Sequence, residues 1–164
     1  MYNHEPSEYK CPFCSVVKGE EGNFPYTKQY DIFYNDKYVT GFIASHWWKN
    51  NPGHAIVIPN NHIENVYDLP SNLNSRINDL AKQTAIAMKK TYACTGTSLR
   101  QHNEPDGDQD VWHYHLHIFP RYKNDDLYLL SHTKKLSRDE DRKTYSKLLR
   151  DWFKENNYKY SYTE

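Results

Sequence analysis

The sequence is poor in cysteine, has no net charge and contains no long apolar run. An odd count of three cysteines argues against a disulfide framework and indicates a reducing compartment, so we expect a cytoplasmic protein. Lys and Arg total 21, as do Asp and Glu, and without a positive field we expect no nucleic acid partner. No segment approaches the roughly 18 apolar residues of a membrane span. Residues 1–10 are polar and lack the apolar stretch of a signal peptide, so we expect no membrane partner.

Aromatic residues, in contrast, are abundant. They make up 15% of the chain and include 15 tyrosines, a content typical of a folded domain rather than of a disordered chain. A length of 164 residues is enough for one domain with one core. No internal repeat or interdomain linker is evident in the sequence, so residues 1–164 are predicted to form a single domain.

The hydrophobic pattern predicts an α+β fold with an antiparallel sheet. Strands are expected at residues 28–35, 38–43, 54–58, 97–102 and 111–119. Apolar residues at helical spacing predict a long helix over 73–92, with Ser71 or Asn72 as its cap, and a last helix over 138–154. A short helical stretch is expected at 63–67. Strands dominate the middle of the chain and helices lie between and after them, which favours the α+β class.

Three histidines alternate along the last predicted strand. Side chains alternate across a strand, so His113, His115 and His117 are expected on one face, with about 6.6 Å between neighbours. Core strands rarely carry such a row, because each buried imidazole nitrogen needs a polar partner. Two functions suit the row. The histidines could bind a catalytic metal together with a ligand from elsewhere, or one imidazole could attack a phosphorus while its neighbours stabilise the developing charge.

The sequence His-Tyr-His-Leu-His-Ile-Phe at 113–119 resembles the signature of the histidine triad (HIT) superfamily. Further blocks resemble bacterial members that carry a CxxC motif, in the same order: Cys-Pro-Phe-Cys at 11–14, Gly-His-Ala-Ile-Val-Ile-Pro at 53–59, His-Ile-Glu-Asn-Val at 62–66, and Asn103 followed by Gln109. The resemblance implies a HIT-like fold with about five antiparallel strands, one long helix and a C-terminal helix, usually in a homodimer. The motif core would span about 11–121, and a C-terminal helical extension about 122–164.

The resemblance also implies an activity. HIT enzymes hydrolyse or transfer at the α-phosphate of nucleotide conjugates, such as nucleoside phosphoramidates or dinucleoside polyphosphates, without an organic cofactor. His115 would form a covalent nucleotidyl-histidine intermediate, and His117 and His54 would bond to the phosphate or the nucleophile. Gln109 would contact the phosphate, and Asn103 would position the ribose or phosphate. Uridylyl transferases of this superfamily resemble H-P-H-x-Q instead, so Tyr114 and His117 favour a hydrolase.

Cys11 and Cys14 have the spacing of half a zinc site. Bacterial HIT proteins that resemble this chain place a zinc ion between such a pair, the histidine matching His62 and the first histidine of the triad, here His113. A complete Cys₂His₂ set would make the zinc structural and would fix the orientation of His113 beside the nucleophile. The alternative is an inert pair of thiols packed on the sheet.

Two departures from the family pattern concern the substrate. Asp110 stands where many members have Ser or Thr, and an ionised Asp would repel anionic leaving groups, so we expect a neutral or cationic leaving group such as an amine. The segment from Phe42 to His46 replaces a short block in which an aspartate holds the ribose. Phe42 and His46 are therefore candidate substrate contacts, although His46 could equally be an exposed loop residue.

Two other functions stay open at this point. One is a metal-dependent hydrolase in which His113, His115 and His117 are ligands, although no companion cluster of carboxylates is evident. The other is a nucleotide-binding regulatory module with vestigial activity.

Overall fold

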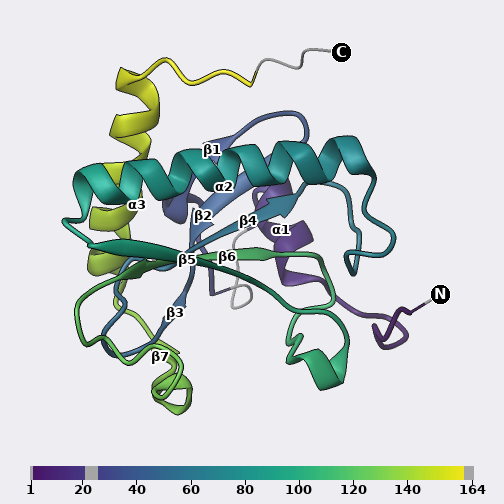
Figure 1. Ribbon diagram of the computed structural model, residues 1–164. Coiled ribbons are helices and arrows are strands. Elements are labelled where there is room, and N and C mark those ends of the chain that lie inside the picture. The colour runs from purple at the N-terminus through teal and green to yellow at the C-terminus, as the bar shows by residue number, and fades with distance from the viewer. Residues whose placement is uncertain (1, 21–25, 161–164) are drawn as a thin grey trace.

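Five antiparallel strands form the central sheet of the computed structural model, which describes residues 2–20 and 26–160. The spatial order is β1-β2-β4-β6-β5 (Figure 1), with the bounds β1 Ile32–Asn35, β2 Val39–Ile43, β4 Ala55–Pro59, β6 Leu116–Arg121 and β5 Gly96–Gln101. A second, two-stranded sheet pairs β3 (His46–Trp47) with β7 (Lys135–Leu136). The helices are α1 Pro12–Lys18, α2 Ser71–Thr91 and α3 Asp139–Glu155, with 3₁₀ turns η1 Gln29–Asp31, η2 Pro105–Gly107 and η3 Ser131–Thr133. The predicted α+β class with a five-stranded antiparallel sheet is confirmed.

Helix α2 covers one face of the sheet (Figure 1). Its buried residues recur every three or four positions, as expected for an amphipathic helix: Arg76, Ile77, Leu80, Ala81, Thr84, Ala87 and Met88. Each fully buried aliphatic side chain of this kind stabilises the fold by about 1.5–3 kcal/mol. Beneath α2, every residue of β2 and β4 is buried. Among the described residues, no helix is both long enough and apolar enough to cross a membrane.

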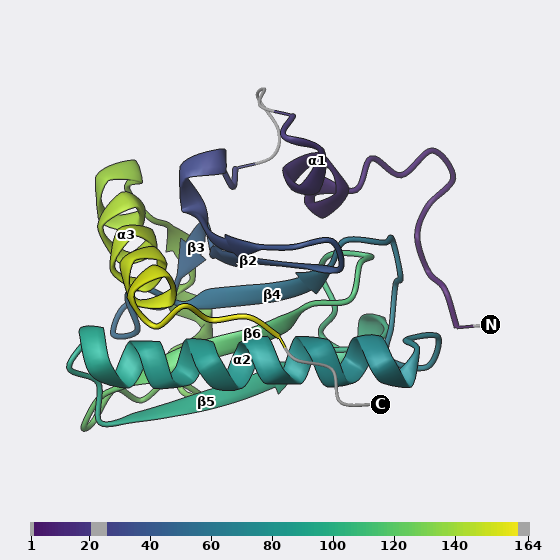
Figure 2. The ribbon, with the colours of Figure 1, turned by 90° about the horizontal axis from the view of Figure 1, so that it is seen from above.

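Helix α3 packs against β1 and α2 (Figure 2). A buried ion pair anchors it, because the Arg142 guanidinium donates to Asp31 Oδ1 over 3.0 Å. The Ser146 hydroxyl adds a 2.7 Å hydrogen bond to the Tyr30 carbonyl. Arg142 also donates to the Ser137 carbonyl over 2.8 Å, so the same side chain holds the segment that follows β7. The C-terminal residues are therefore built into the fold.

The bounds predicted for the last strand, residues 111–119, are wrong at both ends. The strand β6 begins at Leu116, because the preceding backbone bonds elsewhere: the amide of His113 donates to the Val111 carbonyl and that of Tyr114 to the Ile63 carbonyl. It also continues through Pro120 to Arg121. Pairing with β4 reaches only Ile118, so the amide hydrogen that Pro120 lacks is not needed there.

Two expected helical features also differ in the structure. Residues 63–67 form no helix, because the Asn65 side chain accepts hydrogen bonds from the Tyr67 and Asp68 amides and holds a turn instead. Helix α2 begins at Ser71 itself, with Pro70 as the N-cap and no capping side chain. The expected caps, Ser71 and Asn72, are thus the first two helical residues.

Gly53, which immediately precedes His54, is expected to be intolerant of substitution. Its φ is +80°, and an added Cβ would lie 2.5 Å from Tyr145 Cδ1 and 2.8 Å from Tyr92 Cε2. Gly19 has a similar φ of +75° but no atom within 4 Å, so Gly19→Ala measures the backbone strain alone. We expect Gly53→Ala to lower the free energy of unfolding by about 2 kcal/mol more than Gly19→Ala in urea denaturation. Equal losses would contradict the steric argument.

Candidate active site

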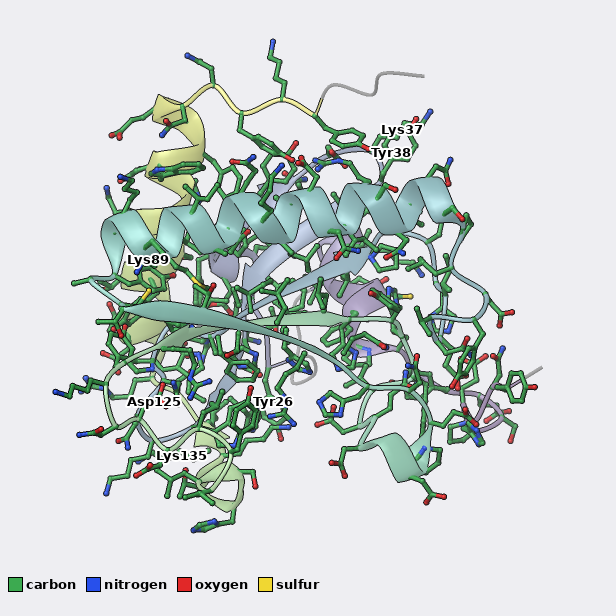
Figure 3. All side chains as sticks on the ribbon, viewed as in Figure 1. Tyr26, Lys37, Tyr38, Lys89, Asp125 and Lys135 are labelled. Atoms are coloured by element: carbon green, nitrogen blue, oxygen red, sulfur yellow. The ribbon has the colours of Figure 1, made fainter. Side chains whose placement is uncertain are left out.

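A cavity of about 450 Å³ is the candidate site. Its walls come from α1, the β2–β3 connection, β4, β6 and one residue near β7, and its polar lining includes Tyr26, Ser45, His46, His54, Asp110, His115, His117 and Lys134. Tyr26 and Lys135 lie on the side of the sheet opposite α2 (Figure 3). One helix therefore covers the first face of the sheet, and the polar groups gather at the second.

His115 is the candidate nucleophile. Its Nδ1 lies 2.7 Å from the backbone carbonyl oxygen of His113. A carbonyl can only accept, so Nδ1 carries the hydrogen and Nε2 keeps its lone pair. The His115 side chain is 2% exposed, and burial lowers its pKa below the ordinary value. The imidazole is therefore neutral near pH 7, with its reactive nitrogen fixed.

His54 and His117 form a hydrogen-bonded pair beside this nucleophile. His54 Nδ1 faces the His46 carbonyl at 3.4 Å, so it donates, and His54 Nε2 accepts from His117 Nδ1 over 3.0 Å. The His54 ring stacks on Phe119 at a centroid distance of 4.0 Å. His117 Nε2 is therefore left with a lone pair. Burial lowers the pKa of His54 to about 3 and that of His117 well below its ordinary value, so both rings are neutral unless an anion is bound.

His113 faces a different site from the other two histidines of the motif. The side chain is fully buried, and its Nδ1 lies 3.3 Å from Cys11 Sγ and 3.6 Å from Cys14 Sγ. The expected row on one strand face is thus divided. His115 and His117 line the cavity, whereas His113, which precedes β6, belongs to a cysteine cluster.

This cluster contains all four predicted metal ligands. Cys11, Cys14, His62 and His113 each present a ligand atom, and these atoms lie within 4.8 Å of one another. His113 Nε2 donates to the Pro59 carbonyl over 2.9 Å, and His62 Nε2 lies 2.9 Å from Glu5 Oε2. Acceptors at the outer nitrogens leave both Nδ1 atoms free to bind a cation, which is the arrangement typical of metal-binding histidines. The donor set fits zinc.

Three predicted substrate contacts lie outside the cavity lining: Phe42, Gln109 and Asn103. Phe42 is fully buried and packs on Phe13 at 5.4 Å between centroids, so it cannot touch a substrate. The Gln109 amide bonds to the carbonyls of Glu64 and Val111 and to the Glu104 amide. Its polar atoms therefore hold a loop in this structure, and its contact with a substrate phosphate stays a prediction.

Asn103 likewise serves the surrounding backbone. Its Oδ1 accepts from the Val66 amide over 2.9 Å, and its side chain exchanges hydrogen bonds with Gln101. His46, by contrast, lines the cavity, is half-buried in β3 and meets the Tyr26 ring at 5.5 Å. His46 is therefore not an exposed loop residue, which was the alternative to a substrate contact.

Lys134 is a cavity residue that the local sequence pattern did not single out. The Lys134 ammonium donates to Asp110 Oδ2 over 2.6 Å. Although burial by itself raises the pKa of Asp110, the hydrogen bond and charge of Lys134 lower that pKa below its ordinary value. Asp110 is thus ionised, as expected, but its charge is paired. The expectation that Asp110 repels anionic leaving groups stays a prediction, but it was made without Lys134, which the sequence does not place beside Asp110.

The buried His54 imidazole is expected to make stability depend on pH. The folded protein keeps His54 neutral down to about pH 3, whereas the unfolded chain has the ordinary pKa of 6.5. Below pH 6.5 the unfolded state binds a proton that the folded state does not, so the free energy of unfolding falls as pH falls. Between pH 6.5 and 5 this loss is about 2 kcal/mol.

Urea denaturation at pH 7 and pH 5 measures this loss. We expect the wild type to lose about 2 kcal/mol more than His54→Gln, which lacks the titrating ring. His132→Gln removes an exposed histidine and should retain the wild-type loss. An identical pH dependence in wild type and His54→Gln would show that this ring is not held neutral.

Known proteins have sequences related to this chain. Residues 27–124 match the HIT domain family. The protein hit of Bacillus subtilis is 32% identical over 116 residues, which cover 71% of this chain and 74% of that protein. Adenosine 5'-monophosphoramidase HNT1 of Saccharomyces cerevisiae is 30% identical over 112 residues, covering 68% of this chain and 62% of the yeast protein.

Solved structures share the fold. A Hit-like protein from Bartonella henselae superposes with a TM-score of 0.74 at 24% identity, covering 87% of this chain and 97% of that chain. A Zn-bound histidine triad family protein from Mycobacterium smegmatis gives 0.72 at 24% identity, covering 90% and 96%. Plasmodium falciparum diadenosine triphosphate hydrolase gives 0.66 at 18% identity, covering 88% and 97%. With the matched residues spanning most of the sheet and both cavity histidines of the motif, this chain belongs to the HIT domain family.

Proposed function

We propose that this protein hydrolyses nucleotide conjugates at the α-phosphate through a covalent nucleotidyl-His115 intermediate. The observation that carries the proposal is the 2.7 Å hydrogen bond from His115 Nδ1 to the His113 carbonyl. It leaves Nε2 as the only basic nitrogen of a neutral ring that lines the cavity. Membership of the family adds support, because its members include hydrolases of nucleotide conjugates.

The first step forms the intermediate. The lone pair on His115 Nε2 attacks the α-phosphorus, and the bond to the leaving group breaks with its electron pair going to the leaving group. His117, protonated at Nε2 when an anionic phosphate is bound, gives its proton to the departing atom. The resulting imidazolium keeps its Nδ1 hydrogen bond to the His113 carbonyl.

The second step releases the nucleotide. Neutral His117 accepts a proton from a water molecule as the water oxygen attacks phosphorus, and the bond between phosphorus and Nε2 breaks. The products are a nucleoside monophosphate and the neutral His115 ring. His54 holds His117 in place through the 3.0 Å bond between the rings. Both phosphoramidates and dinucleoside polyphosphates fit this chemistry, and the yeast and Plasmodium proteins are named for one of each type.

The alternative of a metal-dependent hydrolase finds less support. In the described part of the chain, the group of potential metal ligands includes His113 but neither His115 nor His117. A regulatory module that only binds nucleotide would need no fixed, unprotonated Nε2. A turnover assay distinguishes such a module from an enzyme, because the module would bind nucleotide without releasing monophosphate.

His115→Ala is expected to abolish turnover while nucleotide binding survives. Removing the nucleophile should reduce kcat by at least about 1,000-fold. Mass spectrometry after an alkaline denaturing quench should find an adenylyl group on the His115 peptide of the wild type, with adenosine phosphoramidate or diadenosine tetraphosphate as substrate. His132→Ala, an exposed histidine, is the matched control and should behave as wild type. Near-normal activity of His115→Ala would exclude the mechanism.

We also propose that Cys11, Cys14, His62 and His113 hold a structural zinc ion. The support is the donor set, its spacing and the acceptors at both outer imidazole nitrogens. A protein of the same fold from Mycobacterium smegmatis is Zn-bound. The ion would fill its coordination with protein ligands and fix α1 against the His113 backbone. It would take no part in the chemistry at His115.

Metal analysis of purified protein tests the zinc proposal. We expect one zinc per chain, lost in Cys11→Ser together with a lower unfolding temperature, because structural zinc contributes to folding. Cys94→Ser is the matched control, since Cys94 is buried outside the cluster. Metal that survives Cys11→Ser but disappears in His115→Ala would instead support the metal-dependent hydrolase.

Three further expectations stay predictions: one domain over residues 1–164, a homodimer, and a cytoplasmic location. The resemblance to bacterial HIT proteins implies the homodimer, and the cysteine content implies the compartment. Sedimentation of the purified chain would measure the oligomeric state.

A further inference from the structure

Asp110 and Lys134 form an ion pair at the nucleophile. Lys134 Nζ lies 2.6 Å from Asp110 Oδ2, while the other carboxylate oxygen, Oδ1, lies 3.8 Å from His115 Nε2. The carboxylate therefore bonds to Lys134 and lies near His115 Nε2 without a hydrogen bond to it. The Asp110 and Lys134 side chains are 56% and 41% exposed, so both can turn without disturbing the core.

The backbone that carries Lys134 is held more firmly than its side chain. The strand β7 starts at the next residue and pairs with β3, with Leu136 opposite His46. The amide and hydroxyl of Ser137 both donate to the Ser45 carbonyl, over 2.9 and 2.7 Å. These bonds fix the origin of the Lys134 side chain relative to the cavity wall that contains Ser45 and His46.

The Asp110 carboxylate occupies space that a reacting phosphate would need. A phosphorus under attack must approach to about 3–3.5 Å of His115 Nε2, and Asp110 Oδ1 already lies 3.8 Å from that atom. A substrate phosphate would thus displace an anion that Lys134 now binds. Among the described residues that line the cavity, Lys134 is the only Lys or Arg. The freed ammonium is therefore the natural partner of an incoming phosphate.

The side of the phosphate that Lys134 would contact follows from the same geometry. Attack on phosphorus is in line, so the leaving group departs opposite the nucleophile. The carboxylate presents one oxygen to His115 and the other to Lys134. A substrate in its place would present the phosphorus to His115 and a different group to Lys134, which we assign to the leaving group.

We propose that Lys134 binds the anionic leaving group after exchanging Asp110 for substrate phosphate, which makes dinucleoside polyphosphates better substrates than phosphoramidates. This inference rests on the proposed nucleotidyl-histidine mechanism. It reverses the sequence-based expectation of a neutral or cationic leaving group. The Asp110 carboxylate, which would repel an anionic group, is already paired with Lys134.

Steady-state kinetics of Lys134→Met with two substrates test the proposal. We expect kcat/KM for diadenosine tetraphosphate to fall about tenfold or more, as for loss of one charge-assisted contact. The value for adenosine phosphoramidate, whose leaving group carries no phosphate, should change less than about twofold, and Lys134→Arg should recover most of the loss. Lys135→Met is the matched control, because this exposed neighbour does not line the cavity and should leave both values unchanged.

Binding measurements on a variant without turnover test directly whether substrate phosphate replaces the Asp110 carboxylate at Lys134. In the His115→Ala background, calorimetry should show weaker binding of diadenosine tetraphosphate when Lys134→Met is added. Adding Asp110→Asn instead should tighten binding severalfold, because the competing carboxylate is gone. Unchanged or weaker binding with Asp110→Asn would overturn the exchange.

The two proposals fail in different ways. If wild type forms no adduct on His115 with either substrate, the covalent mechanism itself is wrong. If wild type forms the adduct but Lys134→Met lowers kcat/KM equally for both substrates, or for neither, the covalent mechanism stands and the leaving-group role of Lys134 is excluded.

Discussion

The hydrogen bond from His115 Nδ1 to the His113 carbonyl is the interaction on which the site depends. It selects the tautomer that leaves Nε2 basic. The residue that supplies this carbonyl also extends its side chain to Cys11 and Cys14, and its Nε2 donates to the Pro59 carbonyl. The cysteine cluster therefore supports the nucleophile through the backbone of one residue. Because small displacements of a reacting group are costly, the zinc ion proposed at His113 would preserve the geometry at His115 without entering the chemistry.

Burial of the histidines lowers their pKa values and so keeps the rings uncharged. His54, His115 and His117 lie where the charged form is disfavoured, so they are free bases at neutral pH. A buried polar nitrogen without a partner costs about 1–3 kcal/mol, and carbonyls and neighbouring rings satisfy the inner nitrogens here. A phosphate in the cavity would restore a proton to His117 by its negative charge. In the proposed mechanism, substrate binding would thus protonate the residue that gives its proton to the leaving group.

The C-terminal part of the chain completes the cavity. Arg142, buried against Asp31, ties α3 to the first strands and also holds the backbone after β7. The short β3–β7 pair then fixes the residue beside it, Lys134, against the cavity wall. The proposed leaving-group contact is therefore built from chain far from the triad.

The sequence alone determined the family and the fold class and singled out the CxxC pair, His115 and His117, while the set of Cys11, Cys14, His62 and His113 followed from the resemblance to bacterial HIT proteins. The CxxC pair and the alternating histidines are recognisable because they are local patterns that need no knowledge of distant contacts. Only the tertiary structure decided that His115 and His117 line a cavity apart from His113, that Phe42 and Gln109 have internal partners, and that Lys134 pairs with Asp110. The physical reason is that a side chain's partners across the fold depend on long-range packing. A two-residue strand such as β7 carries no periodic signal that could predict its pairing.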